Sequence, residues 1–183
     1  MANLTTLQNV KDWLGLESDD DDTLLTRMVS AISEYIQSWL NRDLLTAAYT
    51  EILDGNGGVK LMLSNYPVNT VTSLTVDGQT IPSAVDSQGA GYMVTPNLIL
   101  LLGSYSFTKA LQNVVVSYTA GFAVTPPEIE QAVIELIALR YKERDRIGHV
   151  SKSLGGETVT FSQKDFPADV LTILNNYRKV VPL

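Results

Sequence analysis

Few residues in this chain are of the types that perform catalysis or bind metals. His149 is the only histidine among 183 residues, and there is no cysteine. A thiol nucleophile and a histidine- or cysteine-rich metal site are therefore excluded. The sequence contains no Gly-x-Ser-x-Gly elbow, no His-Glu-x-x-His pair and no P-loop. We favour a solvated loop histidine over a catalytic base, and we expect no enzyme activity, no cofactor and no metal.

Two segments resemble ion-binding loops, and a structural interpretation is favoured for both. Ser18–Thr23 reads SDDDDT, and acids just before an apolar repeat are typical of a helix N-cap and first turn. Asp54–Gly58 reads DGNGG, which favours a tight hairpin turn. A calcium loop would need alternating ligands, a glycine at its turn and a distal glutamate, and neither segment has this spacing.

Basic residues gather near position 145, and two interpretations of them stay open. Arg140, Lys142, Arg144, Arg146 and Lys152 could be a solvated helix end with ordinary dipole complementarity. They could instead form a contact surface for an acidic partner or for DNA phosphates. The net charge of −7 argues against a general electrostatic grip on nucleic acid, and so against a DNA-binding regulator.

The element that must position these cations is a helix predicted over Thr125–Arg146. We expect Thr125 to be its N-cap, with Pro126 and Pro127 at its first positions. Three- and four-residue spacing defines one apolar stripe, and further apolar residues widen it, so the helix needs neighbours on more than one side. The stripe consists of Ile129, Ala132, Val133, Leu136, Ile137 and Tyr141.

The rest of the chain predicts helices at both ends and strands between them. We expect one domain over residues 1–183: N-terminal helices (1–45), a β-rich insertion (46–122), the central helix (123–147), and a loop, strand and final helix (148–183). The fold class is α+β: mainly a helical bundle of about four helices, with an inserted small antiparallel sheet of five or six strands. A C-terminal strand plus short helix ends it. No signal peptide or membrane-spanning run is apparent.

The segment after the central helix has its own expectation. Gly148–Gly156 is small, polar and glycine-bearing, which predicts a mobile loop. Glu157–Phe161 alternates like a single strand with unpaired edges. We therefore expect this strand to pair with the middle sheet or with a neighbouring subunit.

The order of these elements and several motifs resemble a known family. The most specific motifs are Tyr118–Phe122 (YTAGF) running into Pro126–Ile129 (PPEI), Arg140–Asp145 (RYKERD) and Leu174–Arg178 (LNNYR). Nearly the whole chain, least so about 78–112, is similar to the head–tail connector (head completion, adaptor) proteins of long-tailed double-stranded DNA bacteriophages. That family carries no catalytic signature.

The resemblance implies a structural virion protein, made in the host cytoplasm and located at the head–tail interface. Copies would form a ring, commonly a dodecamer, under the portal protein after DNA packaging. The ring would extend the DNA channel, hold no specific DNA sequence, and offer a platform for the stopper or tail. The acidic balance suits a channel wall that must not retain DNA. The main alternative is another tail-completion or tail-tube protein, a class that is typically β-dominated.

The resemblance and the unpaired strand together suggest surfaces rather than a catalytic site. The helix Glu128–Arg146 is expected to contact a neighbouring subunit, and Gly148–Phe161 to contact the portal or a neighbour. No membrane contact is expected. The candidate interface residues are Ile129, Val133, Leu136, Ile137, Arg140, Arg144, His149, Lys152, Val159 and Phe161.

Overall fold

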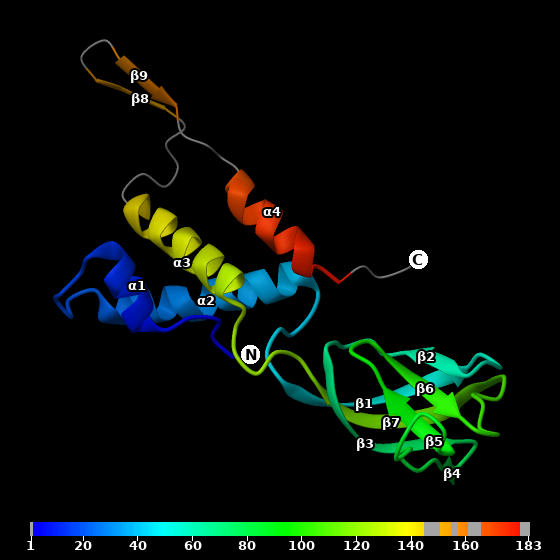
Figure 1. Ribbon diagram of the computed structural model, residues 1–183. Coiled ribbons are helices and arrows are strands. Elements are labelled where there is room, and N and C mark those ends of the chain that lie inside the picture. The colour runs from blue at the N-terminus through cyan, green and yellow to red at the C-terminus, as the bar shows by residue number, and fades with distance from the viewer. Residues whose placement is uncertain (1, 145–150, 155–156, 161–165, 180–183) are drawn as a thin grey trace. The chain divides into compact units, whose positions relative to one another are not determined.

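The computed structural model describes residues 2–144, 151–154, 157–160 and 166–179 (Figure 1). The chain divides into two compact units, each of which is considered by itself. The helical unit comprises Met1–Arg42 and Thr125–Leu183, and the sheet unit comprises Asp43–Val124. The expectation of a single domain over 1–183 stays a prediction.

The helical unit has four helices among its described residues. Thr6 caps the first, its hydroxyl oxygen accepting a hydrogen bond from the Asn9 amide at 3.2 Å, and Gly15 ends it in the left-handed conformation. Asn41 ends the second in the same conformation. The helices are α1 (Leu7–Leu14), α2 (Asp22–Leu40), α3 (Pro127–Lys142) and α4 (Ala168–Tyr177).

Helix α3 packs against each of the other three helices (Figure 1). Half of its sixteen residues are buried, and they include the whole predicted apolar stripe together with Ile134 and Ala138. The predicted N-cap of α3 was wrong. Pro126 occupies the N-cap position, no side chain caps the helix, and Thr125 is a buried residue that precedes it.

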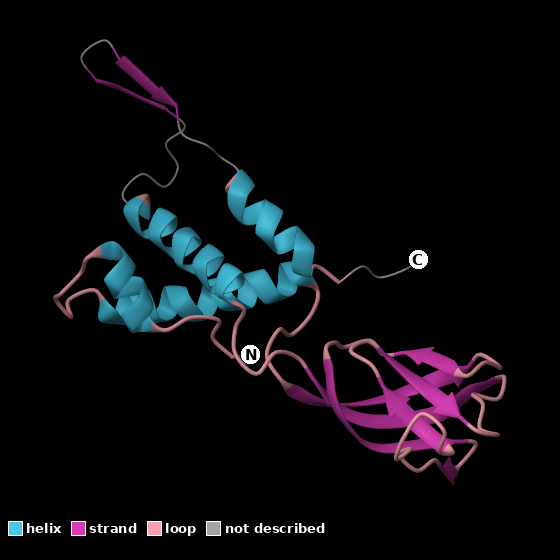
Figure 2. Ribbon diagram, viewed as in Figure 1, coloured by secondary structure: helices cyan, strands magenta, loops and turns pink. Residues whose placement is uncertain are grey.

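The sheet unit holds seven strands in two antiparallel sheets (Figure 2). One sheet has the order β1-β7-β3-β4 and the other β2-β6-β5. Their apolar residues form one core, with Phe107 and Tyr118 among its largest members. The strands are β1 (Ala47–Gly55), β2 (Lys60–Met62), β3 (Val68–Val76), β4 (Gln79–Thr80), β5 (Gly91–Val94), β6 (Leu98–Leu102) and β7 (Ala110–Ala120).

The chain enters and leaves the sheet unit at adjacent points. The Phe122 amide donates to the Leu44 carbonyl at 2.8 Å, and the Thr46 amide donates to the Phe122 carbonyl at 2.9 Å. Gly121 makes this approach possible. Its φ is +114°, and a Cβ there would lie 2.5 Å from the Leu45 carbonyl oxygen. The Thr-Ala-Gly-Phe motif therefore closes the insertion at its base.

A polar cluster orders the loop that follows β2. The buried Tyr118 hydroxyl donates to Glu51 Oε1 at 2.6 Å and accepts from the Asn65 amide at 3.2 Å. The Asn65 side chain also donates to Glu51, at 3.2 Å. Burial, followed by the hydrogen bond to Glu51, raises the pKa of Tyr118, which keeps its hydroxyl a donor to the carboxylate.

The predicted fold class, mainly a helical bundle, was wrong. The structure is 34% helical and 29% strand, and the strands of the insertion form two antiparallel sheets. The difference arises in the insertion, where β1 and β3 each span nine residues and β7 spans eleven. The insertion was predicted to be one small sheet, whereas its strands form two sheets that share one core.

The segment after α3 also differs from its prediction. Ser151–Leu154, expected in a mobile loop, forms strand β8 and pairs antiparallel with β9 (Glu157–Thr160). The predicted strand therefore pairs with its sequence neighbour rather than with the middle sheet. Residues 148–150, 155–156 and 161 of the same expectation lie outside the described residues. In the described part, no helix is long and apolar enough to cross a membrane.

Candidate interaction surfaces

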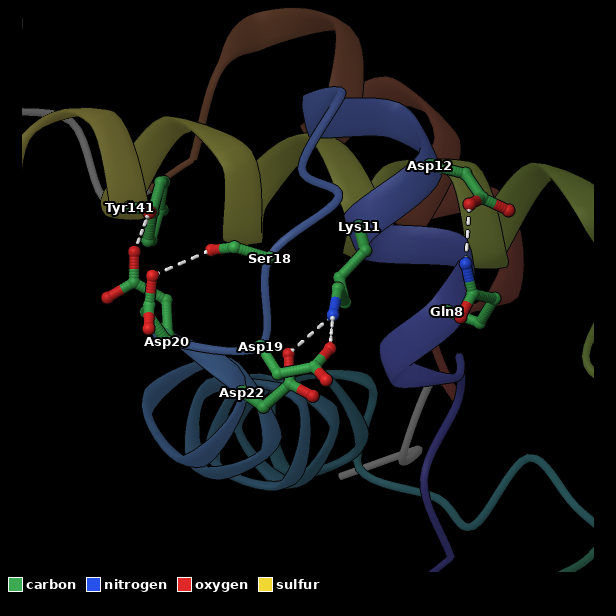
Figure 3. A network of polar contacts seen from close by, with 9 residues as sticks. Gln8, Lys11, Asp12, Ser18, Asp19, Asp20, Asp22 and Tyr141 are labelled. Atoms are coloured by element: carbon green, nitrogen blue, oxygen red, sulfur yellow. Dashed lines mark hydrogen bonds and ion pairs between the residues drawn. The ribbon is translucent and has the colours of Figure 1, made fainter.

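A buried lysine connects α1 to the start of α2 (Figure 3). Lys11 Nζ lies 2.6 Å from Asp19 Oδ1 and 2.8 Å from Asp22 Oδ1. Asp22 Oδ1 is itself buried, and the ammonium group of Lys11 compensates its charge. The Tyr141 hydroxyl donates to Asp21, which joins α3 to the same point.

The ion pairs shift the titration of Lys11 and Asp19 in opposite directions. Hydrogen bonds to Asp19 and then to Asp22 raise the pKa of Lys11, although its desolvation opposes the shift. The hydrogen bond from Lys11 lowers the pKa of the Asp19 carboxyl. Both shifts favour the charged forms, so the pair favours docking of α1 at neutral pH.

The acidic run is therefore occupied by the protein's own side chains. Asp21 holds the N-cap position of α2 but makes no capping hydrogen bond, while Asp22 lies in the first turn. The acidic run therefore occupies the predicted position at the start of α2, but its N-cap side chain does not make the predicted capping hydrogen bond. Within the described ranges, no three histidine, cysteine, aspartate or glutamate side chains are grouped so that they could hold a metal ion.

Aromatic and guanidinium groups alternate where α4 meets α2 and α3. Phe166 is buried; it stacks on Tyr35 with ring centroids 5.1 Å apart and meets Trp39 edge-on at 5.6 Å. Arg140 Cζ lies 5.4 Å from the Tyr35 centroid, and Arg178 Cζ lies 4.8 Å from that of Trp39. We call these five residues the aromatic clasp. Its contacts are offset-stacked, edge-on and cation–π, the favourable geometries for such groups.

The aromatic clasp holds both ends of α4. Phe166 precedes the helix and Arg178 follows it. The Lys179 amide donates to the Leu40 carbonyl at 3.0 Å, and the Tyr177 hydroxyl donates to Glu128 at 3.3 Å. Because both ends are fixed, α4 presents a defined face beside α3.

A family model described as "Head completion protein" matches residues 3–180. The chain belongs to the head completion protein family. The resemblance that rests on the Tyr118–Phe122, Arg140–Asp145 and Leu174–Arg178 motifs is thereby confirmed for the family. No curated protein sequence matches the chain.

Several solved structures have a fold similar to that of this head completion protein. A chain from "Neck of empty GTA particle computed with C6 symmetry" is 23% identical with a TM-score of 0.59, and the match covers 97% of this chain and 90% of that one. One from "Neck of native GTA particle computed with C12 symmetry" is 22% identical with a TM-score of 0.55, covering 87% and 84%. One from "Virion of native gene transfer agent (GTA) particle" is 23% identical with a TM-score of 0.58, covering 97% and 90%. At these identities the likeness is one of fold.

The residues predicted to form an interface fall into three groups. The first group is buried inside the helical unit and is therefore inaccessible on the surface of a single chain. It consists of Ile129, Val133, Leu136 and Ile137. Their interface role stays a prediction, but it would require α3 to be uncovered. The physical reason is that α1, α2 and α4 already cover the helix.

The predicted cations of α3 are exposed. Arg140 belongs to the aromatic clasp. Arg144 lies over the Tyr141 ring, its Cζ 4.1 Å from the centroid, and donates to the Tyr141 carbonyl at 3.3 Å. Aromatic rings thus hold both guanidinium groups in place. The interpretation of these cations as a solvated helix end did not include such contacts.

The third group lies in or near β8 and β9. Lys152 and Val159 are register partners across the hairpin, which places them at the same level of the two strands. His149 and Phe161 lie outside the described residues. The interface role of all four stays a prediction.

Sequence reasoning missed several surface residues. Trp13 is 55% exposed near the end of α1, although no surface role was predicted for it. Phe166 was not singled out, and Arg178 was quoted only within the Leu174–Arg178 motif, although both complete the aromatic clasp. An aromatic residue directly before a predicted short helix, with a cation directly after it, was the available signal.

We expect Asp19→Asn to reduce the acid sensitivity of the helical unit. Because the folded-state pKa of Asp19 is lowered, its contribution to stability is present above the unfolded value, about 4, and is lost as pH falls below it. The carboxamide removes that contribution at pH 7 and leaves less to lose at pH 3. Melting temperatures at both pH values test this, with Asp20→Asn as the matched control. A control variant with the same reduced acid sensitivity would contradict the assignment.

We expect Phe166→Ala to destabilise the helical unit by roughly 3–5 kcal/mol, because it leaves a cavity at the centre of the aromatic clasp. Urea unfolding followed by the helical circular dichroism signal measures the change. Leu171→Ala is the matched control on α4, since Leu171 is 36% exposed, and it should cost under about 1 kcal/mol. Equal losses in the two variants would show that the clasp does not hold α4.

Proposed function

We propose that this chain is a structural head–tail connector that assembles as a ring, a dodecamer in the family, below the portal protein of a virion. The ring extends the DNA channel after packaging, passes DNA without binding a specific sequence, and provides the platform on which the stopper or tail docks. The protein is made in the host cytoplasm and acts in the virion without catalysing a reaction.

The observation that carries this proposal is the family match, which spans residues 3–180. The fold likeness to chains from necks of gene transfer agent particles supports it, because those necks were computed with C6 and C12 symmetry. A chain repeated by such symmetry forms a closed ring. The four helices of the described part speak against a β-dominated tail tube.

The charge distribution is consistent with a channel component. The net charge of −7 gives packaged DNA no general attraction to the protein. The sheet unit is acidic as well, since residues 43–124 hold two cations, Lys60 and Lys109, against five aspartate and glutamate residues. Such surfaces suit protein–protein contact better than a grip on phosphates.

In vitro complementation tests the proposal. Purified protein is added to DNA-filled, tailless capsids of the source phage that lack it, and DNA retention and tail joining are scored. We expect both to be restored to the level of capsids that kept their own copy. A folded protein that neither binds the portal vertex nor restores joining would overturn the proposal in favour of a tail component.

A further inference from the structure

The two arginines at the ends of the aromatic clasp have no carboxylate partner. Both guanidinium groups are exposed and lie over aromatic rings. No carboxylate lies within ion-pair distance of either in the residues that the structure describes. Two exposed apolar residues belong to the same helices, Leu139 of α3 and Leu171 of α4. We call Leu139, Arg140, Leu171 and Arg178 the guanidinium face.

Stacking prepares these arginines to bind anions. Each guanidinium group stands over the face of a ring and keeps N–H donors in a fork that can match the two oxygens of a carboxylate. The ring also restricts the side chain before binding, so less conformational entropy is lost when a partner arrives. The guanidinium face is therefore a preorganised receptor for carboxylates.

A second exposed surface of opposite charge lies at the start of α2. Trp13, in the last turn of α1, is 55% exposed, and Leu24, in the first turn of α2, is 38% exposed. Glu17 and Asp20 are exposed between them. We call these four residues the acidic face.

Most carboxylates at the start of α2 contact other groups of the same chain, whereas those of the acidic face form no ion pair within the described residues. Lys11 pairs with Asp19 and Asp22, and Tyr141 donates to Asp21. Asp20 accepts only from the Ser18 hydroxyl, at 3.0 Å, and no cation pairs with Glu17 or Asp20 in the described part. An exposed tryptophan beside unpaired charges is characteristic of a protein–protein contact.

The two faces carry opposite charge, and Arg178 lies far from the acidic face of its own chain. The acidic face lies at the N-terminal end of α2, whereas Trp39, under Arg178, lies in its last turn. A helix of 19 residues is about 28 Å long, so Arg178 cannot satisfy the carboxylates of its own chain. Two different complementary faces on one protomer are what a head-to-tail contact requires, and such contacts form a ring where the rotation between copies closes.

We propose that the guanidinium face of one copy binds the acidic face of the next copy. Arg140 and Arg178 pair with Glu17 and Asp20, and the exposed apolar residues of the two faces pack against each other. This inference rests on the proposed ring and names its contact. The occupant is a second copy rather than DNA, because two arginines in a chain of net charge −7 give few phosphate contacts.

Reciprocal charge reversal tests the contact. Three variants are compared with the unaltered chain: R140E/R178E, E17K/D20K, and the four changes together. K60E/K109E, which alters the charge of the sheet unit by the same amount, is the matched control for the first variant. The copies bound per tailless capsid of the source phage are counted by quantitative immunoblot, and ring formation in solution is followed by sedimentation velocity.

Each double variant should bind at least tenfold fewer copies, while the control binds as the unaltered chain does. The quadruple variant should recover assembly, because reversing both faces restores their complementarity. An equimolar mixture of the two double variants should recover it too, since their faces alternate in sign. Circular dichroism confirms that each variant is folded.

The outcomes separate this inference from the proposed function. If the unaltered chain assembles on capsids and the double variants assemble equally well, the contact is wrong and the connector role stands. Loss of assembly without recovery in either the quadruple variant or the mixture also overturns the contact. If R140E/R178E forms complete rings but no longer retains DNA in the capsids, the arginines face phosphates instead. Failure of the unaltered chain to bind capsids overturns the connector role itself.

Discussion

The helical unit depends on the burial of α3. α1 has eight residues and α4 has ten, lengths at which an isolated helix is marginal in water. Both are stabilised by packing, and each of them, like α2, packs against α3. The eight buried residues of α3 provide the apolar surface that makes this possible. The contacts that position the exposed faces, Tyr141 with Asp21 and Arg140 with Tyr35, also begin on this helix.

The same constraint explains how the chain accommodates a large insertion. α2 and α3 pack together although the sheet unit separates them in sequence. This requires the chain to enter and leave the sheet unit at neighbouring points. Hydrogen bonds between Leu44, Thr46 and Phe122 provide that closure, and Gly121 allows the close approach. Each unit therefore has its own core.

The helices were predicted from the sequence more accurately than the sheets. Three- and four-residue spacing is a strong local signal, and α3 begins and ends near its predicted limits. The first residues of β7 are exposed, and they owe their strand conformation to pairing with β1, which is distant in the sequence. Local patterns contain no information about such long-range partners, so the β content was underestimated.

The surfaces were predicted least well, for a similar reason. Arg140 was identified as a cation on a helix end, but its ring partner Tyr35 is more than a hundred positions away in the chain. Lys11 gave no sign of burial, because its carboxylate partners lie beyond the end of its own helix. Conversely, the apolar residues proposed for subunit contact are occupied within the chain. Charge and hydropathy indicate residue types, whereas tertiary packing decides which residues remain free.

We propose that this head completion protein forms a ring at the neck of its particle. The most direct test is cryo-electron microscopy of the neck of the source particle, reconstructed without imposed symmetry. We predict a closed ring of identical copies between portal and tail, each with the helical unit and sheet unit described above. A neck that lacks the chain, or holds it as separate copies without mutual contact, would contradict the account.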